Sequence, residues 1–341
     1  MRSPHPTPQA ADMRQSPTPP LPLLAVRDVY KTYVLKRGQS LKAVDGVSFS
    51  VMPGEVLGLV GESGCGKSTL GRCLLRLHDV SSGQILFEGQ DITLLPEHTL
   101  RPLRQRMQMV FQDSYASLNP RRRIGDLLAE PLRVHRAPDG HRRTASSITH
   151  GLAELMDLVS LPQSALERYP HEFSGGQRQR INIARALALA PRLVVADEPV
   201  SALDVSVQAQ IVNLFADLQK QLGLTYVFIA HDLAVVRQIS TRVAVMYLGA
   251  IVELGDTDKV LHNAAHPYTI ALTQAVPQPV VGAPRHAPLR GEIPSPVHKP
   301  SGCRFLTRCP AVQPRCQNDI PILRQLSPGP AVARPYPGLW F

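Results

Sequence analysis

Short apolar runs alternate with helical patterns along most of this chain of 341 residues. The runs that predict strands lie at residues 24–26, 44–51, 56–60, 85–87, 109–111, 193–196, 226–230 and 243–246. Several of them, 56–60 among them, are uninterrupted, which is typical of strands covered on both faces. Strands that alternate with helices predict an α/β architecture with a largely parallel sheet.

The middle and the ends of the chain have different patterns. Apolar residues recur at helical spacing in 124–132, 148–158 and 177–189, which predicts a helical insertion into the α/β core over residues 115–190. Of the 32 prolines, 7 lie in residues 1–22 and 14 in residues 277–341. We therefore divide the chain into a disordered lead-in (1–22), a body (23–276) and a small irregular C-terminal extension (277–341).

A glycine-rich segment follows the predicted strand 56–60 and matches the pattern G-x-x-x-x-G-K-[ST]. Its glycines allow backbone N–H groups to face phosphate oxygens, and the N-terminus of the next helix adds positive potential. Lys67 is expected to reach the β- and γ-phosphates, and the Ser68 hydroxyl to ligate Mg²⁺. This context favours a nucleotide site over a glycine turn with a solvated lysine. The residues of the segment are Gly61, Glu62, Ser63, Gly64, Cys65, Gly66, Lys67, Ser68 and Thr69.

Two adjacent carboxylates follow the predicted buried strand 193–196. Because successive strand residues point in opposite directions, Asp197 and Glu198 can serve different roles. We expect Asp197 to hold Mg²⁺ through water and Glu198 to polarise an attacking water molecule. Taken alone, such a pair is more often a cap before the next helix, but the phosphate-binding segment favours the catalytic interpretation.

Further polar motifs occur at the ends of predicted elements. Ser174, Gly175, Gly176 and Gln177 open the predicted helix 177–189, where exposed backbone N–H groups form an anion site. An ordinary N-cap turn is the simpler interpretation of these four residues. Three single residues make an ordinary N-cap turn implausible, because they follow predicted elements in a fixed order. They are Gln112 after the run 109–111, Asp204 shortly after Glu198, and His231 at the end of the run 226–230.

In this order the motifs resemble those of the ATP-binding subunit of ABC transporters. The resemblance implies an ABC-type P-loop ATPase with a RecA-like core, an antiparallel β subdomain and a helical subdomain. It implies that Tyr33 stacks on adenine, with Tyr30 as a nearby competitor. It also implies that Gln112 senses Mg²⁺ and the membrane subunits. The remaining implied roles are the signature motif at Ser174, Gly175, Gly176 and Gln177, the intersubunit loop at Asp204, and the switch histidine at His231.

Four segments narrow the resemblance to the oligopeptide/dipeptide importer branch: 111–120, 169–172, 266–269, and 291–296 followed by Gly302 and Cys303. This branch implies an ATPase that energises an importer of di- or oligopeptides at the cytoplasmic face of the membrane. An importer of nickel, glutathione or sugars is the alternative for the transported substrate. The implied partners are membrane-spanning permease subunits, an extracellular binding protein that acts indirectly, and a second ATPase subunit. That second subunit is a copy or a paralogue, because in this family each ATP lies between the loop of one subunit and the signature of the other.

The charge of the chain raises one alternative. The 37 Lys and Arg residues exceed the 27 Asp and Glu residues, for a formal net charge of +10, which favours a nucleic-acid partner. However, residues 277–341 hold 8 basic and 2 acidic residues, so most of the excess lies outside the body. A soluble ABC ATPase of DNA repair or of the ribosome is therefore the weaker alternative, and we expect no nucleic-acid partner. No apolar stretch reaches the length of a membrane span.

Three of the five cysteines lie in the extension as C-x5-C-x6-C: Cys303, Cys309 and Cys316. In this importer branch such cysteines can belong to a four-cysteine iron–sulfur or metal site. The fourth is expected in a Val-Ala-Cys-His context, where this chain has Val-Ala followed by Arg334 and Pro335. Three thiolates are an incomplete ligand set unless a histidine such as His298 substitutes, so the sequence favours reduced, packed cysteines over a bound cluster. We also expect the extension to leave nucleotide binding to the body.

Overall fold

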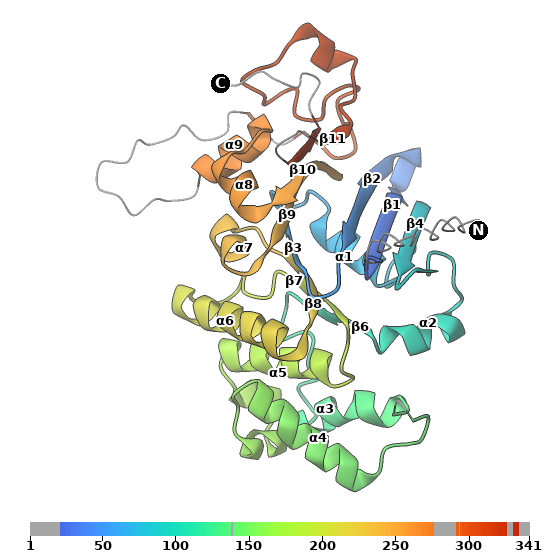
Figure 1. The fold of residues 1–341 in the computed structure, drawn as a ribbon, viewed down its shortest axis with the longest axis vertical. Coiled ribbons are helices and arrows are strands. Elements are labelled where there is room, and N and C mark those ends of the chain that lie inside the picture. The colour runs from blue at the N-terminus through green and yellow to red at the C-terminus, as the bar shows by residue number, and fades with distance from the viewer. Residues whose placement is uncertain (1–20, 138, 276–290, 293, 326–329, 334–341) are drawn as a thin grey trace, which may run out of the picture.

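The structure is a computed structural model that describes residues 21–137, 139–275, 291–292, 294–325 and 330–333. Its larger sheet has eight strands in the order β11-β12-β10-β9-β3-β8-β7-β6 (Figure 1). The strands are β3 (Val56–Val60), β6 (Met107–Val110), β7 (Leu193–Asp197), β8 (Thr225–Ile229), β9 (Arg242–Tyr247), β10 (Ala250–Asp256), β11 (Leu323–Gln325) and β12 (Ala331–Ala333). Five of them, from β9 to β6, run parallel, as the apolar runs predict.

The central strands are buried on both faces, because successive residues enter two different apolar cores. On β7, Val194 and Ala196 pack into the core formed with helices α5 (Gly175–Leu187), α6 (Val205–Leu222) and α7 (Leu233–Ile239). Leu193 and Val195 enter the opposite core. The unbroken apolar runs therefore reflect burial on both sides of the sheet.

The opposite core is covered by a four-stranded antiparallel sheet in the order β2-β1-β4-β5 and by helix α1. The elements are β1 (Leu24–Val34), β2 (Ser40–Val51), β4 (Ser82–Phe87), β5 (Gln90–Asp91) and α1 (Lys67–Leu74). This sheet lies on the side of the main sheet away from α5–α7 (Figure 1). The α/β fold with an antiparallel β subdomain is thus confirmed.

The predicted helical insertion is present, with α3 (Ile124–Val134) and α4 (Ala145–Leu158) at one end of the molecule (Figure 1). Short 3₁₀ turns at Gln163–Glu167 and Pro170–Glu172 connect it to α5. Helix α5 begins at Gly175, two residues before the predicted start. A capping box between Ser174 and Gln177 causes this earlier start, because it satisfies the backbone N–H groups of these two residues.

The extension is less irregular than the sequence predicts. Strand β12 pairs antiparallel with β10 and carries β11 at its outer edge, so the extension continues the main sheet. Strand β10, which pairs with β9, was not predicted from the sequence. The other elements are α2 (Glu97–Arg104), α8 (Thr257–His262), α9 (Pro267–Gln274) and 3₁₀ turns at Lys36–Gly38 and Pro314–Gln317. Residues 1–20 of the predicted lead-in lie outside the described residues. Among the described helices, none has the length and apolarity needed to span a bilayer.

Candidate nucleotide-binding site

The glycine-rich segment forms a loop between the end of β3 and the start of α1 at Lys67. Gly61 and Gly66 have positive φ values of 152° and 107°. A Cβ atom at either position would collide with a backbone carbonyl oxygen, that of Met246 or Ala43 respectively. The glycines therefore allow the loop to pass between β2 and β9 at close range. We call residues 61–69 the phosphate loop.

The Lys67 ammonium group folds back over the phosphate loop. Its Nζ donates hydrogen bonds to the carbonyl oxygens of Gly61 at 2.8 Å and Glu62 at 3.2 Å. It also lies 3.7 Å from Glu198 Oε1, and the side chain is only 3% exposed. The loop thus holds a buried cation among acceptors, where it can bind a phosphate anion.

Ser68 and Asp197 meet next to the loop. The Ser68 hydroxyl donates to Asp197 Oδ1 at 2.7 Å, whereas Asp197 Oδ2 is buried without a hydrogen-bond partner among the described residues. Burial raises the pKa of Asp197, and the bond from Ser68 opposes this shift. A hydroxyl beside a carboxylate with a spare oxygen is a donor set that fits Mg²⁺.

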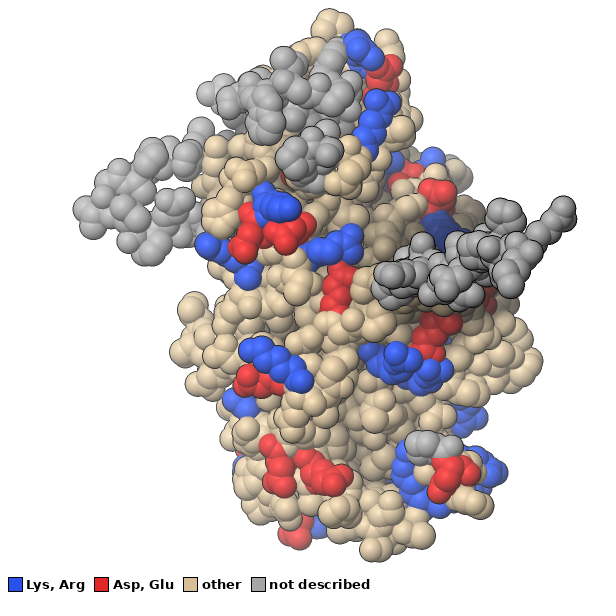
Figure 2. Space-filling view, viewed as in Figure 1, with Lys and Arg blue, Asp and Glu red and all other residues tan. Residues whose placement is uncertain are grey.

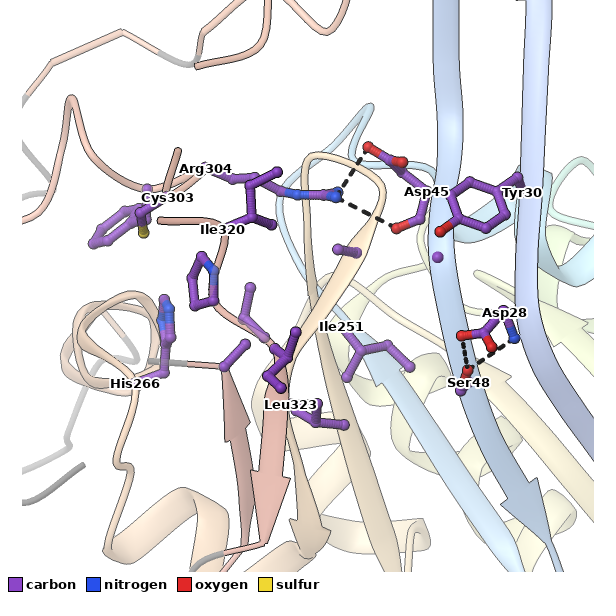
Figure 3. Close-up of a pocket in the computed structure, with 17 residues that line it drawn as sticks. Asp28, Tyr30, Asp45, Ser48, Ile251, His266, Cys303, Arg304, Ile320 and Leu323 are labelled. Carbon is purple, nitrogen blue, oxygen red and sulfur yellow. Dashed lines mark hydrogen bonds and ion pairs between the residues drawn. The ribbon is translucent and has the colours of Figure 1, made fainter. Parts of the chain in front are cut away.

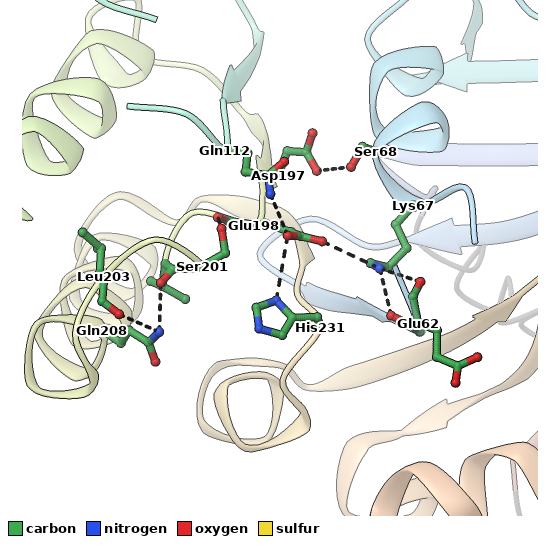
Figure 4. A network of polar contacts seen from close by, with 12 residues as sticks. Glu62, Lys67, Ser68, Gln112, Asp197, Glu198, Ser201, Leu203, Gln208 and His231 are labelled. Atoms are coloured by element: carbon green, nitrogen blue, oxygen red, sulfur yellow. Dashed lines mark hydrogen bonds and ion pairs between the residues drawn. The ribbon is translucent and has the colours of Figure 1, made fainter. Parts of the chain in front are cut away.

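Glu198 lies at the centre of the polar network (Figure 4). Gln112 Nε2 donates to Glu198 Oε2 at 2.9 Å, and His231 Nδ1 lies 3.8 Å from the same oxygen. Glu198 has a positive φ of 45°, which is strained for a residue with a Cβ atom. Its backbone N–H donates to the Ile229 carbonyl at 3.0 Å, which helps to hold this conformation.

The strand order explains why these residues meet. Gln112, Asp197 and His231 lie at or just beyond the carboxyl ends of β6, β7 and β8, and the phosphate loop follows β3. These four strands are neighbours in one parallel sheet, so their carboxyl ends lie at one edge. We call this assembly the phosphate-loop half-site: Lys67, Ser68, Gln112, Asp197, Glu198 and His231.

A cavity of about 270 Å³ opens over the phosphate loop and is lined by Tyr33, Gln112 and Glu198. The competitor Tyr30 lines a different cavity of about 440 Å³, beside Asp45, Arg304 and Cys303 (Figure 3). Tyr33 is therefore the tyrosine that faces the phosphate loop. Its hydroxyl forms a hydrogen bond with His78 Nδ1 at 2.7 Å.

The predicted signature residues lie elsewhere. Ser174 Oγ accepts from the Gln177 N–H at 3.3 Å, and Gln177 Oε1 accepts from the Ser174 N–H at 3.0 Å. These bonds stay within the start of α5, and in the described chain none of them reaches the phosphate loop. A Cβ atom at Gly176 would press on Val207 of α6. Asp204 is exposed at the start of α6. We call Ser174, Gly175, Gly176, Gln177 and Asp204 the signature half-site.

The extension contacts this region at two places that the sequence did not predict, one at the phosphate loop and one at the cavity. Arg308 forms an ion pair with Glu62 of the phosphate loop, and Pro296 lines the cavity. The extension thus contacts the phosphate loop and the cavity, while its independence from nucleotide binding stays a prediction. No local sequence signal identifies these contacts, because Arg308 belongs to no motif and Pro296 belongs to a segment, 291–296, that indicates only the family.

The three extension cysteines are placed as follows. Cys303 and Cys316 are buried and Cys309 is half-buried, and the Cys303 N–H donates to the Cys316 carbonyl at 2.8 Å. Burial raises the pKa of the Cys303 thiol. Within the described ranges, no group of three or more His, Cys, Asp or Glu side chains is arranged to hold a metal ion. Arg334, at the position of the expected fourth cysteine, lies outside the described residues.

Comparison with known proteins agrees with this geometry. Residues 44–201 match the family described as ABC transporter, and residues 252–316 match the oligopeptide/dipeptide transporter C-terminal region. The chain is 50% identical over 322 residues to the oligopeptide transport ATP-binding protein AppF of Bacillus subtilis, covering 91% of this chain and 96% of AppF. The chain belongs to the ABC transporter family. The resemblance drawn from the motifs is thereby confirmed.

Other members of the family are similar over most of their length. The oligopeptide transport ATP-binding protein OppF of Salmonella typhimurium is 48% identical over 312 residues, covering 88% of this chain and 92% of OppF. Among solved structures, the dimeric ATP-binding cassette MJ0796 bound to ADP and Pi has a TM-score of 0.62 at 26% identity. It covers 69% of this chain and 98% of its own. This chain is accordingly an ATP-binding cassette that hydrolyses ATP.

Proposed function

We propose that this ATPase energises an importer of di- or oligopeptides. One observation carries the proposal: the same chain contains an assembled phosphate-loop half-site and a match to the oligopeptide/dipeptide transporter C-terminal region. The relatives AppF and OppF are named for oligopeptide transport, which supports the same cargo class.

In the proposed reaction the phosphate-loop half-site binds and orients ATP. Tyr33 stacks on the adenine ring, and Lys67 and the backbone N–H groups of the phosphate loop bind the β- and γ-phosphates. Ser68, Gln112 and Asp197 would hold Mg²⁺, which neutralises developing charge on the phosphates when bound. Glu198 accepts a hydrogen bond from the attacking water and draws its proton away, while Gln112 and His231 fix the position of the Glu198 carboxylate.

A second ATPase subunit completes the site in this proposal. The backbone N–H groups of Gly175 and Gly176, in the first turn of α5, would bind the γ-phosphate held by the partner's phosphate loop. Permease subunits bind the dimer at the cytoplasmic face of the membrane, and an extracellular binding protein acts through them. Positive and negative side chains are interspersed on the face drawn in Figure 2, without a basic stripe, which agrees with a non-nucleic-acid partner.

The test is to purify the tagged full chain from native membranes and to measure ATPase activity in vesicles that contain its permease subunits. We expect co-purification of membrane subunits and stimulation of hydrolysis by a binding protein loaded with di- or oligopeptides. The Glu198→Gln variant serves as the inactive control. Stimulation by nucleic acid instead would overturn the transporter assignment, and stimulation only by nickel-, glutathione- or sugar-loaded binding protein would overturn the peptide cargo.

A further inference from the structure

A bidentate ion pair joins the C-terminal extension to the phosphate loop. Arg308 Nη1 donates to Glu62 Oε2 at 2.7 Å, and Arg308 Nη2 donates to Glu62 Oε1 at 2.9 Å. The Arg308 side chain is 4% exposed and that of Glu62 is 22% exposed. Such a two-bond guanidinium–carboxylate contact fixes orientation as well as distance, and burial limits its screening by solvent.

The position of Arg308 is fixed by an aromatic cluster. Phe305, which is 1% exposed, packs with its ring centre 5.3 Å from that of Tyr247 on β9 and 5.5 Å from that of Tyr268 on α9. The Arg308 N–H donates to the Phe305 carbonyl at 3.1 Å, which closes a turn. The extension therefore presents Arg308 from a packed anchor.

Both backbone polar groups of Glu62 form hydrogen bonds. Its N–H donates to the Tyr268 hydroxyl at 2.8 Å, and its carbonyl accepts from Lys67 Nζ at 3.2 Å. Figure 4 shows the Glu62 carboxylate directed away from Glu198 and the polar network around it. A displacement of Glu62 would thus move a carbonyl that positions the Lys67 ammonium group.

The ion pair also balances a negative charge in the phosphate loop. Glu62 places a carboxylate within a loop that binds a polyanion, and like charges at short range repel. Arg308 balances this charge and directs the carboxylate toward the extension. Without Arg308, the loop that binds the phosphates would carry an unpaired anion.

A separate contact brings the extension to the nucleotide cavity. Pro296 lines the cavity beside Lys42 and Gly249. Three residues later, Lys299 Nζ donates to the Lys42 carbonyl at 2.7 Å and pairs with Asp45 at 3.2 Å. The extension therefore contacts the body at two places near the phosphate loop, through Lys299 at β2 and through Arg308 at Glu62.

We propose that Arg308 is a positioning residue for ATP binding, through which the C-terminal extension sets the affinity of the phosphate loop for nucleotide. The proposal rests on ATP binding at the phosphate loop, and it does not depend on the transported cargo. It assigns the extension a role in the nucleotide site of its own subunit.

Titration of the full chain with trinitrophenyl-ATP tests the proposal. Arg308→Gln should weaken binding about tenfold, the effect typical of losing a hydrogen-bonded charge pair. Arg308→Lys keeps the charge but loses the two-bond geometry, and should weaken binding about threefold. The matched control is Arg315→Gln, which removes an exposed extension pair with Asp319 and should leave affinity unchanged.

The double variant Glu62→Gln/Arg308→Gln separates positioning from general stability. Because it removes both charges, it should recover binding to within about threefold of wild type, a coupling that a purely structural loss would not show. In the assembled complex, Arg308→Gln should raise the KM for ATP and change kcat less than about twofold. If Arg308→Gln does not fold, the same comparison is made with Arg308→Lys.

Two results would overturn the proposal: unchanged affinity in Arg308→Gln, or a double variant as weak as the single one. Failure of the nucleotide site itself is a different outcome, because then the wild-type chain would also fail to bind the analogue. Failure of the peptide assignment would appear only in the vesicle assay and would leave these dissociation constants unaffected.

Discussion

The phosphate-loop half-site and the signature half-site differ in how completely the chain assembles them. In the first, Lys67 is buried and bonded to the loop, and Glu198 contacts Gln112, His231 and Lys67. In the second, Ser174 and Gln177 are exposed and bond to each other. The difference indicates that one half-site is pre-organised within the subunit, whereas the other is exposed, as the proposed dimer requires.

The difference has a topological origin. The carboxyl ends of four neighbouring parallel strands lie at the phosphate-loop half-site, so residues far apart in sequence meet there. The signature half-site depends on local structure, namely the capping box at the start of α5 and the close packing of Gly176 on α6. A capped helix N-terminus can bind an anion, but it supplies neither a base nor a metal ligand.

The largest effect is expected at the centre of the pre-organised half-site. Glu198→Gln should still bind ATP but lose about 10²–10⁴-fold in turnover, because the base that polarises water is removed while the phosphate contacts survive. Steady-state ATPase assays and size-exclusion chromatography with ATP measure both effects. Glu154→Gln, an exposed carboxylate in α4, is the matched control. Activity within a few-fold of wild type would contradict the role of Glu198.

Lys67→Ala should act on binding. Loss of a charge-assisted contact with phosphate costs about 1.5–3 kcal/mol of binding free energy, which lowers the affinity for ATP roughly 10–150-fold. Titration with a fluorescent ATP analogue gives the dissociation constant, and Lys220→Ala at the exposed end of α6 is the control. An unchanged constant would show that the buried lysine does not bind the nucleotide.

Tyr33→Ala should have a smaller effect on the same titration. Aromatic stacking contributes about 0.5–1.5 kcal/mol, so affinity should fall roughly 2–12-fold. Tyr30→Ala should leave affinity unchanged, because Tyr30 lines the other cavity. A larger loss in Tyr30→Ala than in Tyr33→Ala would reverse the assignment.

The smallest expected effect is a partial recovery of ATPase activity in mixed dimers, and it tests directly whether the two half-sites act together. Lys67→Ala disables the phosphate-loop half-site and Ser174→Arg blocks the signature half-site, so each homodimer should be inactive. In an equal mixture, mixed dimers retain one intact composite site, and about a quarter of the wild-type sites should be restored. Complementation is measured as ATPase activity after mixing. Proven mixed dimers without any recovery would show that the two half-sites do not act across an interface.

Sequence patterns alone predicted the features that depend on neighbouring residues. Unbroken apolar runs identified the central strands because both faces of the sheet are covered, as Val194 and Val195 show by entering opposite cores. The glycine pattern identified the phosphate loop because only glycine tolerates the close approach to Ala43 and Met246. The order of polar motifs then led to the family.

Tertiary structure decided the contacts between distant segments. The pairing of β12 with β10 has no local signal, because short strands in a proline-rich segment are stabilised by the partner strand. The same holds for Arg308 and Glu62, which are 246 residues apart and resemble ordinary surface charges in the sequence. They meet only because the aromatic cluster around Phe305 fixes the extension against β9 and α9, and this packing depends on the complete path of the chain.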